Sequence, residues 1–176
     1  TITYLFNGSM QHRDSLHNDV VIGPGAVNLM TAGSGIVHSE RSDKAARKGI
    51  ANLFGIQSWL ALPISFEETA PDFMQYGKAV LPTFKDQGVE GRVLLGTWQT
   101  LCSPVSFPSD SLYVDLHMKP SSHVYFSRDH HERAVFSVSG AIEVDGILYP
   151  ASELLVLKPG RDVLIHAPEG ARVLLF

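Results

Sequence analysis

The segment GSGIVHSE, residues 33–40, places an imidazole and a carboxylate two positions apart, directly after two glycines. In a β-strand, side chains at i and i+2 point to the same face, so His38 and Glu40 would reach into one space. Imidazole and carboxylate groups are common ligands of divalent metals. Spacing alone leaves a second interpretation open, an exposed pair or an ordinary hydrogen bond on a strand. The pattern therefore makes His38 and Glu40 candidate metal ligands.

Residues near this pair have simpler expected roles. Gly33 and Gly35 precede the candidate ligand strand, where a sharp turn or a positive φ requires a residue without a Cβ. His12 lies in QHRDS, which leads into the polar turn DSLHND, and we expect its side chain to face solvent. His17 lies in that turn, and we expect it to be exposed.

The composition excludes several classes of protein. The 176 residues are 44% hydrophobic and 18% charged, without long blocks of like charge, which argues against disorder and against a polybasic nucleic-acid arm. The net charge of −4 also argues against direct DNA binding. A single cysteine, Cys102, excludes an internal disulfide framework. Neither a membrane span nor a signal peptide is visible, so we expect a cytoplasmic protein.

Short apolar stretches separated by Gly, Pro, Asp and Asn dominate the chain and predict many short antiparallel strands with little helix. In these strands, Met30, Phe54 and Trp59 are expected in the core. Asp145–Gly146 is a tight hairpin signal. The strands expected in the first third of the chain are 1–6, 9–13, 20–22, 27–31, 36–40 and 50–62.

The strand rhythm stops after Pro63 and resumes at Arg92. The intervening stretch contains charged clusters and prolines, with a weak helical turn near 66–69. We therefore expect an N-terminal domain at 1–62, a connector at 63–91 and a C-terminal domain at 92–176.

An internal repeat links the two domains. With Gly8 aligned on Gly140, TITYLFNGSMQH lies on RAVFSVSGAIEV, and His38 then falls on His166 after small length changes. Each copy alternates strands with glycine or proline turns. The repeat predicts two copies of one small antiparallel barrel, each with a protected interior at its mouth.

The segments TITYLFNGSMQHRDS and IGPGAVNLMTAGSGIVHSE, residues 1–15 and 22–40, resemble the first half of the pirin family of the cupin superfamily. The likeness covers the whole chain, more loosely in the second half. It implies an all-β, jelly-roll-like bicupin of two antiparallel cupin-type β-barrels. It also implies that the N-terminal barrel binds one iron, or another divalent metal such as manganese, nickel or copper, through three histidines and a glutamate.

Carried over by residue, His38 and Glu40 match the third and fourth ligands of the family. The resemblance places the other two in a His-x-His pair upstream of Thr1, so either the chain is a piece of a longer protein, which we expect, or the protein has lost half of its metal site. Metal binding by the chain alone would then be weak or absent, because such chemistry needs at least three protein ligands.

The repeat also tests the second barrel. Glu132 occupies the position of the carboxylate in the cupin motif, but Arg128 and Phe126 stand where histidines are required. His130, His131 and His166 could form an offset site, although adjacent strand residues point to opposite faces. We interpret these histidines as surface or turn residues.

The family resemblance implies quercetin 2,3-dioxygenase activity on flavonol-like aromatics, with Glu40 bound to the metal or acting as a general base. A second hypothesis is a metal-gated or redox-gated regulatory module that binds a protein partner without turnover, like a transcription cofactor. A different small substrate also stays open, since fold is weak evidence for chemistry. We expect no direct nucleic-acid or membrane partner, and a monomer, because paired internal barrels supply the interface that single barrels obtain by dimerising.

Overall fold

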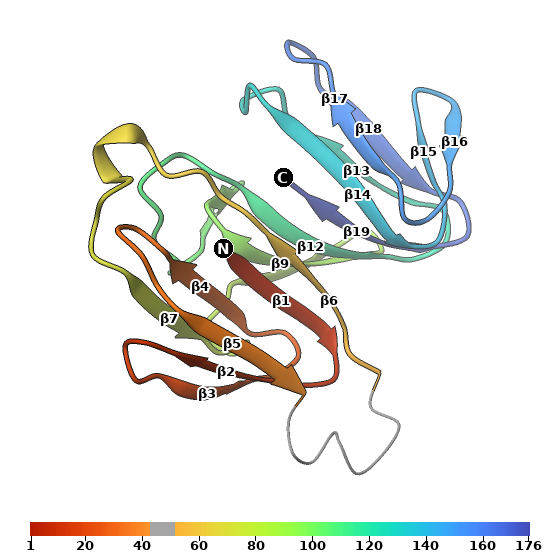
Figure 1. Ribbon diagram of the computed structural model, residues 1–176. Coiled ribbons are helices and arrows are strands. Elements are labelled where there is room, and N and C mark those ends of the chain that lie inside the picture. The colour runs from red at the N-terminus through yellow and green to blue at the C-terminus, as the bar shows by residue number, and fades with distance from the viewer. Residues whose placement is uncertain (43–51) are drawn as a thin grey trace. The chain divides into compact units, whose positions relative to one another are not determined.

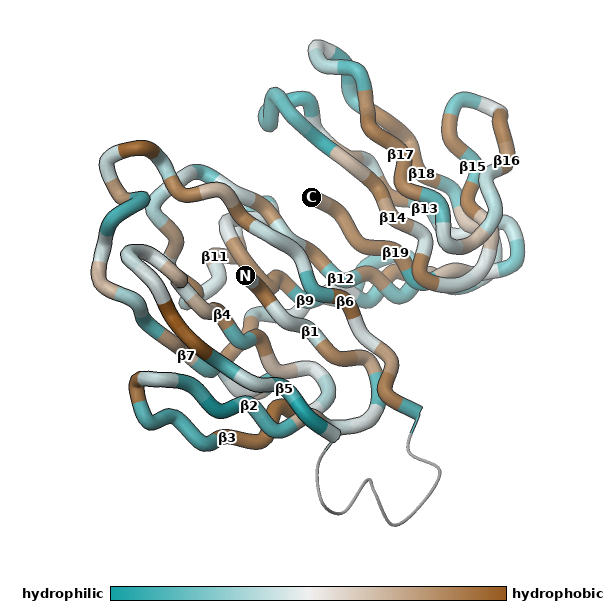
Figure 2. The backbone as a smooth tube through the Cα atoms, in the orientation of Figure 1, coloured by the Kyte–Doolittle hydropathy of each residue, from teal (hydrophilic) through white to brown (hydrophobic). Residues whose placement is uncertain are grey.

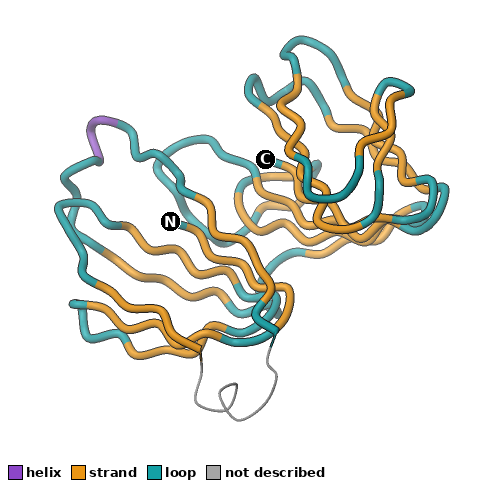
Figure 3. The backbone as a smooth tube through the Cα atoms, turned by 45° about the vertical axis from the view of Figure 1, so that its right-hand side comes forward, coloured by secondary structure: helices purple, strands orange, loops and turns teal. Residues whose placement is uncertain are grey.

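The computed structural model describes residues 1–42 and 52–176, which divide into two compact units, Thr1–Val80 and Leu81–Phe176. Strands joined by loops make up both units (Figures 1 and 3), and the described part of the chain has one short 3-10 helix, η2 (Ile64–Phe66). This confirms the all-β fold class. No helix among the described residues is long and apolar enough to span a bilayer.

Unit 1 contains two antiparallel sheets. The first has the order β6-β1-β4-β7 and the second the order β3-β2-β5. Sequence neighbours are thus divided between sheets, as in a jelly roll. The strands of unit 1 are β1 (Ile2–Asn7), β2 (Met10–Asp14), β3 (Asp19–Ile22), β4 (Val27–Thr31), β5 (His38–Ser42), β6 (Phe54–Ser58) and β7 (Asp72–Tyr76).

Unit 2 contains a six-stranded sheet of order β17-β14-β19-β12-β9-β8, a four-stranded sheet of order β13-β18-β15-β16 and the small pair β10-β11. Its strands are β8 (Thr83–Asp86), β9 (Val89–Leu95), β10 (Thr97–Trp98), β11 (Leu101–Cys102), β12 (Tyr113–Met118), β13 (Ser122–Phe126), β14 (Arg133–Ser139), β15 (Ile142–Val144), β16 (Ile147–Tyr149), β17 (Leu154–Leu157), β18 (Val163–Ala167) and β19 (Ala171–Leu175).

Alternation of apolar and polar residues places a hydrophobic core in each unit (Figure 2). In unit 1, Leu5, Met10 and Ile22 form a buried cluster, and Phe73 packs against it. The core of unit 2 is larger and mostly aliphatic, and the buried aromatic residues of the unit include Trp98, Phe126 and Tyr113. The two interiors therefore differ in character as well as in size.

Two expectations about domain layout differ from the structure. The strands form separate open sheets and not barrels closed by hydrogen bonds. The stretch 63–91, expected as a connector, supplies β7 to unit 1 and β8 with the start of β9 to unit 2. β7 and β8 are edge strands with exposed polar side chains. Their few apolar residues therefore alternate with charged residues and stand near prolines, so the sequence pattern of a strand is hard to recognise there.

The expected strand boundaries hold for β1 to β4 within two residues. The turn at Gly33 and Ser34 is followed by an irregular segment, 35–37, so β5 starts at His38 and not at Ile36. For the strand expected at 50–62, residues 50 and 51 lie outside the described residues, and of 52–62 only Phe54–Ser58 is strand (β6), so the expected strand is too long. Met30 is buried as expected, but Phe54 is 50% and Trp59 88% exposed, so the expectation of core positions for these two was wrong.

Candidate metal centre

The candidate ligands lie on β5, which pairs with β2 so that Glu40 is opposite His12 and His38 is opposite Asp14. Residues directly opposite each other in an antiparallel pair project from the same face. The register therefore gathers two imidazoles and two carboxylates on one face of the sheet.

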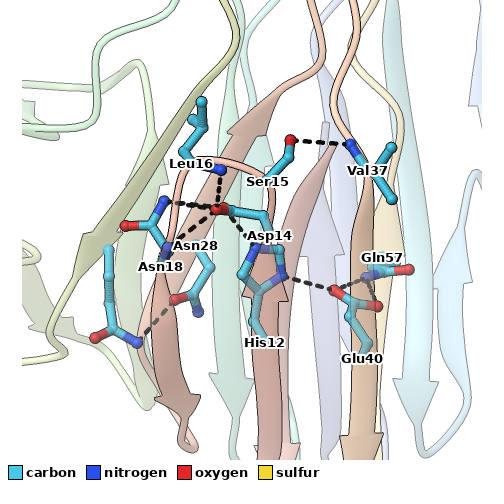
Figure 4. Close-up of polar contacts among 10 residues, drawn as sticks. His12, Asp14, Ser15, Leu16, Asn18, Asn28, Val37, Glu40 and Gln57 are labelled. Carbon is cyan, nitrogen blue, oxygen red and sulfur yellow. Dashed lines mark hydrogen bonds and ion pairs between the residues drawn. The ribbon is translucent and has the colours of Figure 1, made fainter.

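Glu40 is held from the other sheet of unit 1 (Figure 4). Gln57 on β6 donates from Nε2 to both carboxylate oxygens of Glu40, at 2.9 and 2.8 Å, and lies 3.0 Å from Thr3 Oγ1 on β1. The Glu40 side chain is 23% exposed. Its carboxylate thus points between the two sheets and has one firm donor.

His38 is placed differently from Glu40. Its ring stacks on that of His12 with 5.7 Å between ring centroids, yet the residue is exposed. The strand geometry expected from the spacing is present, but only Glu40 of the pair is sheltered. His38 is therefore the exposed member of the pair.

Asp14 is a fixed anion at the end of β2. Its carboxylate accepts hydrogen bonds from the backbone N–H groups of Leu16 and Asn18 and from the Asn18 side chain. Burial acts to raise the pKa of Asp14, but the hydrogen bonds from Asn18, His12 and Leu16 outweigh it and hold that pKa below its ordinary value. Asp14 is therefore ionised at neutral pH and can only accept hydrogen bonds.

His12 is buried, with 1% of its side chain exposed, so the expectation that it faces solvent was wrong. Its ring stacks on Phe73 with 4.1 Å between centroids, and its Nε2 lies 3.0 Å from Asp14 Oδ2. The alternation of β2 places His12 on the same face as the core residue Met10. His17 is exposed, as expected.

The glycines before β5 have the conformations expected of them, with φ of +51° at Gly33 and +134° at Gly35. A Cβ on Gly33 would lie 2.1 Å from the carbonyl oxygen of Thr69. The same carbonyl accepts a hydrogen bond from Ser34 N–H at 2.9 Å. Gly33 thus allows the loop that leads into β5 to bond to the segment after η2.

A polar row crosses the facing sheet of unit 1. The register places Gln57 beside Thr3, Thr3 beside Asn28, and Asn28 beside Gln75. Gln75 Nε2 donates to Asn28 Oδ1 at 2.9 Å and to the carbonyl of Val21 on the other sheet at 3.2 Å. This row and the β2–β5 face make the interior of unit 1 unusually polar.

The same positions in unit 2 are aliphatic. When Gly8 is matched to Gly140, the strand pairings of the two units correspond, and the glycines share φ values of +79° and +75°. The equivalents of Thr3, Asn28, Gln57, His12 and Glu40 are Val135, Leu155, Leu175, Val144 and Ile165. The fold therefore does not require polar residues at these positions.

This register corrects the earlier alignment of His38 with His166. Because Glu40 corresponds to Ile165, His38 corresponds to Val163, and His166 belongs to the opposite face of β18. There His166 Nδ1 lies 3.4 Å from Glu143 Oε2, with both side chains part-exposed. His130 and His131 lie in the loop before β14, and Phe126 is a core residue.

Among residues 1–42 and 52–176, no three His, Cys, Asp or Glu side chains are grouped so that they could hold a metal ion. Within that part of the chain, unit 1 offers His38 and Glu40 as a partial donor set. His12 Nδ1 lies beside them, buried and without a hydrogen-bond partner. The His38 imidazole and the Glu40 carboxylate are donor types that suit a borderline divalent metal, but two donors are fewer than a metal site requires.

Comparison with known proteins agrees with this architecture. The Pirin family model matches residues 1–60, and the Pirin C-terminal cupin domain model matches residues 113–176. A pirin-like protein of Caulobacter vibrioides is 38% identical over 99% of this chain and 61% of its own length. The chain thus spans less than two thirds of this relative.

Solved structures show the same cupin jelly-roll fold. Quercetin 2,3-dioxygenase from Acinetobacter baumannii has a TM-score of 0.88 and 31% identity, over 99% of this chain and 57% of that one. The nickel(II) complex of the bacterial pirin YhhW from Escherichia coli has a TM-score of 0.76 and 22% identity, over 99% of this chain and 69% of that one, which shows the fold alone. The two family models and the Caulobacter relative establish that the chain belongs to the pirin family.

Proposed function

We propose that unit 1 is the metal-binding half of a pirin-type dioxygenase that acts on flavonol-like aromatics, with His38 and Glu40 as metal ligands. The observation that carries the proposal is the contrast between the two units. Buried polar groups weaken a core unless they are satisfied or used. Unit 2 shows that the fold accepts aliphatic residues at these positions, so the polar interior of unit 1 has a purpose other than folding.

The donor set suits iron, manganese, nickel or copper, and the nickel complex of the Escherichia coli pirin supports nickel as the first metal to test. Further donors would come from a strand beside β5. In unit 2, β18 has β13 on one side and β15 on the other, whereas in the described part of unit 1 β5 is the last strand of its sheet. A strand placed like β13 would face Glu40 directly.

A metal held there would act as a Lewis acid and lower the pKa of a phenolic hydroxyl bound to it. Glu40 is the residue of this chain best placed to accept the released proton, because its carboxylate lies in the site and is part-buried. Gln57 would keep that carboxylate oriented through its two hydrogen bonds. The exposed His38 ring marks the side from which a substrate would enter.

The proposal is tested by aerobic consumption of quercetin by the natural protein reconstituted with iron, manganese, nickel or copper. Glu40→Gln should abolish turnover. Glu143→Gln is the matched control, since Glu143 is also a strand glutamate beside a histidine, and should leave turnover unchanged. No loss of quercetin with any of the four metals would refute the dioxygenase proposal.

A regulatory role without turnover is the second candidate. It is supported by the exposure of large apolar side chains in unit 1, with Val37 at 77%, Trp59 at 88% and Ile64 at 87%. Exposed apolar surface is typical of protein-binding sites. Metal binding that depends on Glu40, combined with no quercetin loss, would favour this candidate over the enzyme.

A further inference from the structure

The amide of Asn28, in the polar row of unit 1, has a fixed orientation. Gln75 Nε2 lies 3.2 Å from the carbonyl oxygen of Val21, and because a carbonyl only accepts, the Gln75 atom at that place is the nitrogen. The same nitrogen donates to Asn28 at 2.9 Å (Figure 4), so the Asn28 atom that faces Gln75 is Oδ1. Nδ2 of Asn28, which carries two hydrogens, is therefore directed elsewhere.

This amide nitrogen is a buried donor. Asn28 is 1% exposed, and among the described residues its Nδ2 has no hydrogen-bond partner. The oxygen and the nitrogen lie on different sides of an amide carbon, so Nδ2 points away from β7 and toward the side of β1 and β6. From that side Gln57 reaches Glu40. The donor is thus directed into the half of the interior that holds the candidate ligand Glu40.

Thr3 adds a second donor beside Asn28. The two residues are directly opposite each other on β1 and β4, so their side chains are neighbours on one face of the sheet. Thr3 is 4% exposed, and its Oγ1 accepts from Gln57 Nε2 at 3.0 Å, which leaves the hydroxyl hydrogen to be donated. Two buried donors side by side suit an accepting oxygen, such as that of a carbonyl or a phenol, and do not suit a cation.

The fold does not require these donors. Their counterparts in unit 2 are Val135, which is part of the hydrophobic core, and Leu155, which packs against it. A buried donor without a partner destabilises a protein, because its contact with water is lost and not replaced. The donors thus occur in the unit that carries the candidate ligands and are replaced by apolar residues in the other.

We propose that Asn28 is a specificity-determining residue: its Nδ2–H, beside the Thr3 hydroxyl, donates to an oxygen substituent of the substrate that is remote from the oxygen bound to the metal. The inference rests on the proposed function in taking an oxygen-bearing aromatic as the substrate. Asn28 and Gln57 are two strand spacings apart, about 10 Å, which is the scale of a flavonol. The site then selects flavonols with hydroxyl groups on the rings away from the metal.

Two flavonols separate contact with the metal from contact with Asn28. 3-Hydroxyflavone carries only the adjacent hydroxyl and carbonyl that a metal would bind, whereas quercetin carries further hydroxyl groups on its other rings. The measurement is the dissociation constant of each flavonol for the natural protein loaded with Ni(II), by calorimetry in the absence of oxygen. Asn28→Leu should weaken the binding of quercetin about 5- to 30-fold and leave that of 3-hydroxyflavone unchanged.

Leucine is chosen because unit 2 has leucine at the corresponding position. Asn7→Leu is the matched control: Asn7 is an exposed asparagine at the end of β1 whose Nδ2 already donates to the carbonyl of Asn52, and its replacement should change neither constant. Circular dichroism shows whether each variant is folded. A loss of equal size for both flavonols, or unchanged binding of quercetin, would overturn the inference.

A second measurement uses the wild-type natural protein loaded with Zn(II), which is diamagnetic. The side-chain amide resonances of Asn28 should shift when quercetin is added and not when 3-hydroxyflavone is added, and those of Asn7 should stay in place. Resonances of Asn28 that do not respond to quercetin would assign this amide to folding or to a bound water, and would also overturn the inference.

The failure of the inference and the failure of the proposed function give different results. If Asn28→Leu consumes quercetin with the KM of the wild type, the inference is wrong and the dioxygenase proposal stands. If binding of quercetin depends on Asn28 but no metal supports its consumption, the inference stands and the dioxygenase proposal is wrong. If the wild type binds neither flavonol, both are wrong.

Discussion

At the scale of single residues, the two carboxylates of the site differ in how they are held. Asp14 accepts from two backbone N–H groups and two side chains, and its pKa is low for that reason. Glu40 has Gln57 as its donor and His12 Nδ1 just beyond hydrogen-bond distance. Asp14 is thus a fixed structural anion, and Glu40 keeps the freedom that a ligand or a base requires.

The low pKa of Asp14 predicts an acid-dependent part of the stability of unit 1. Between its folded pKa and its ordinary value of 3.8, the unfolded chain binds more protons than the folded chain, so the free energy of unfolding falls as the pH falls. The contribution is complete above the ordinary pKa and is lost below the folded one. Asp14→Asn should remove it.

The measurement is denaturant unfolding, followed by circular dichroism, of both proteins from neutral to acid pH. Other carboxylates, including Glu90 with its lowered pKa, are common to both proteins and cancel in the difference. Identical pH dependence in the two proteins would contradict the prediction.

The sequence indicates His38 and Glu40 as candidate ligands, but the expectation that His12 faces solvent was wrong, and the reason is physical. QHRDS reads as polar because Gln11 precedes the histidine and Arg13, Asp14 and Ser15 follow it. The signal that could have found it is the period of two that groups Met10, His12 and Asp14 on one face. Whether such a face is buried depends on the facing sheet, which a local pattern does not contain.

At the scale of elements, the turns that join the two sheets depend on close backbone approach. A Cβ on Gly140, between β14 and β15, would lie 2.2 Å from the carbonyl oxygen of Gly170. Gly146, in the β15–β16 hairpin expected from Asp145–Gly146, has nearly the same φ, +74° against +75°, and open space around it. The two glycines share conformational strain but differ in crowding.

We therefore expect Gly146→Ala to destabilise unit 2 by about 1–2 kcal/mol, the cost of a left-handed alanine. Gly140→Ala should cost about 2–5 kcal/mol, because displacement of the crowded backbone adds to that strain. Denaturant unfolding of the two variants measures the difference. Equal losses would show that the turn of Gly140 relaxes freely.

The strands that the sequence did not predict share one property. β7 and β8 lie at the edges of their sheets, and their exposed positions carry Asp, Gln, Lys and Thr, with Met74 as the apolar exception. Edge strands carry charge because it discourages pairing with other chains. The same polar composition leaves such strands without the alternation of apolar and polar residues by which a strand is recognised in a sequence.

At the scale of the whole molecule, two copies of one topology have diverged in their interiors. The resemblance and the repeat predicted the fold class and the two units. They did not predict the pairing register, which shows that His166 is on an outer face and that Ile165 replaces the glutamate. The sequence alignment of the two repeats can shift by one or two residues at a loop and still match strand to strand, so it does not decide which residues correspond.

The contrast between the polar interior of unit 1 and the aliphatic interior of unit 2 predicts that metal binding is confined to unit 1. Addition of Ni(II) to the isotope-labelled natural protein should broaden the amide resonances of β2 and β5 and leave those of β15 and β18 sharp. His166→Ala should not alter the result, because that histidine faces away from the core of unit 2. Broadening centred on β18 would show that the outer face competes for the metal.

The two tryptophans of the chain lie in different environments, one in each unit, and this affects their fluorescence. Trp98 is 5% exposed and lies against Phe84 and Phe126 in the core of unit 2, whereas Trp59 in unit 1 is 88% exposed. Loss of structure moves Trp98 from a dry environment into water and changes little around Trp59. The tryptophan emission of this chain therefore reports the unfolding of unit 2. Unit 1, with its polar interior, can unfold with little change in emission.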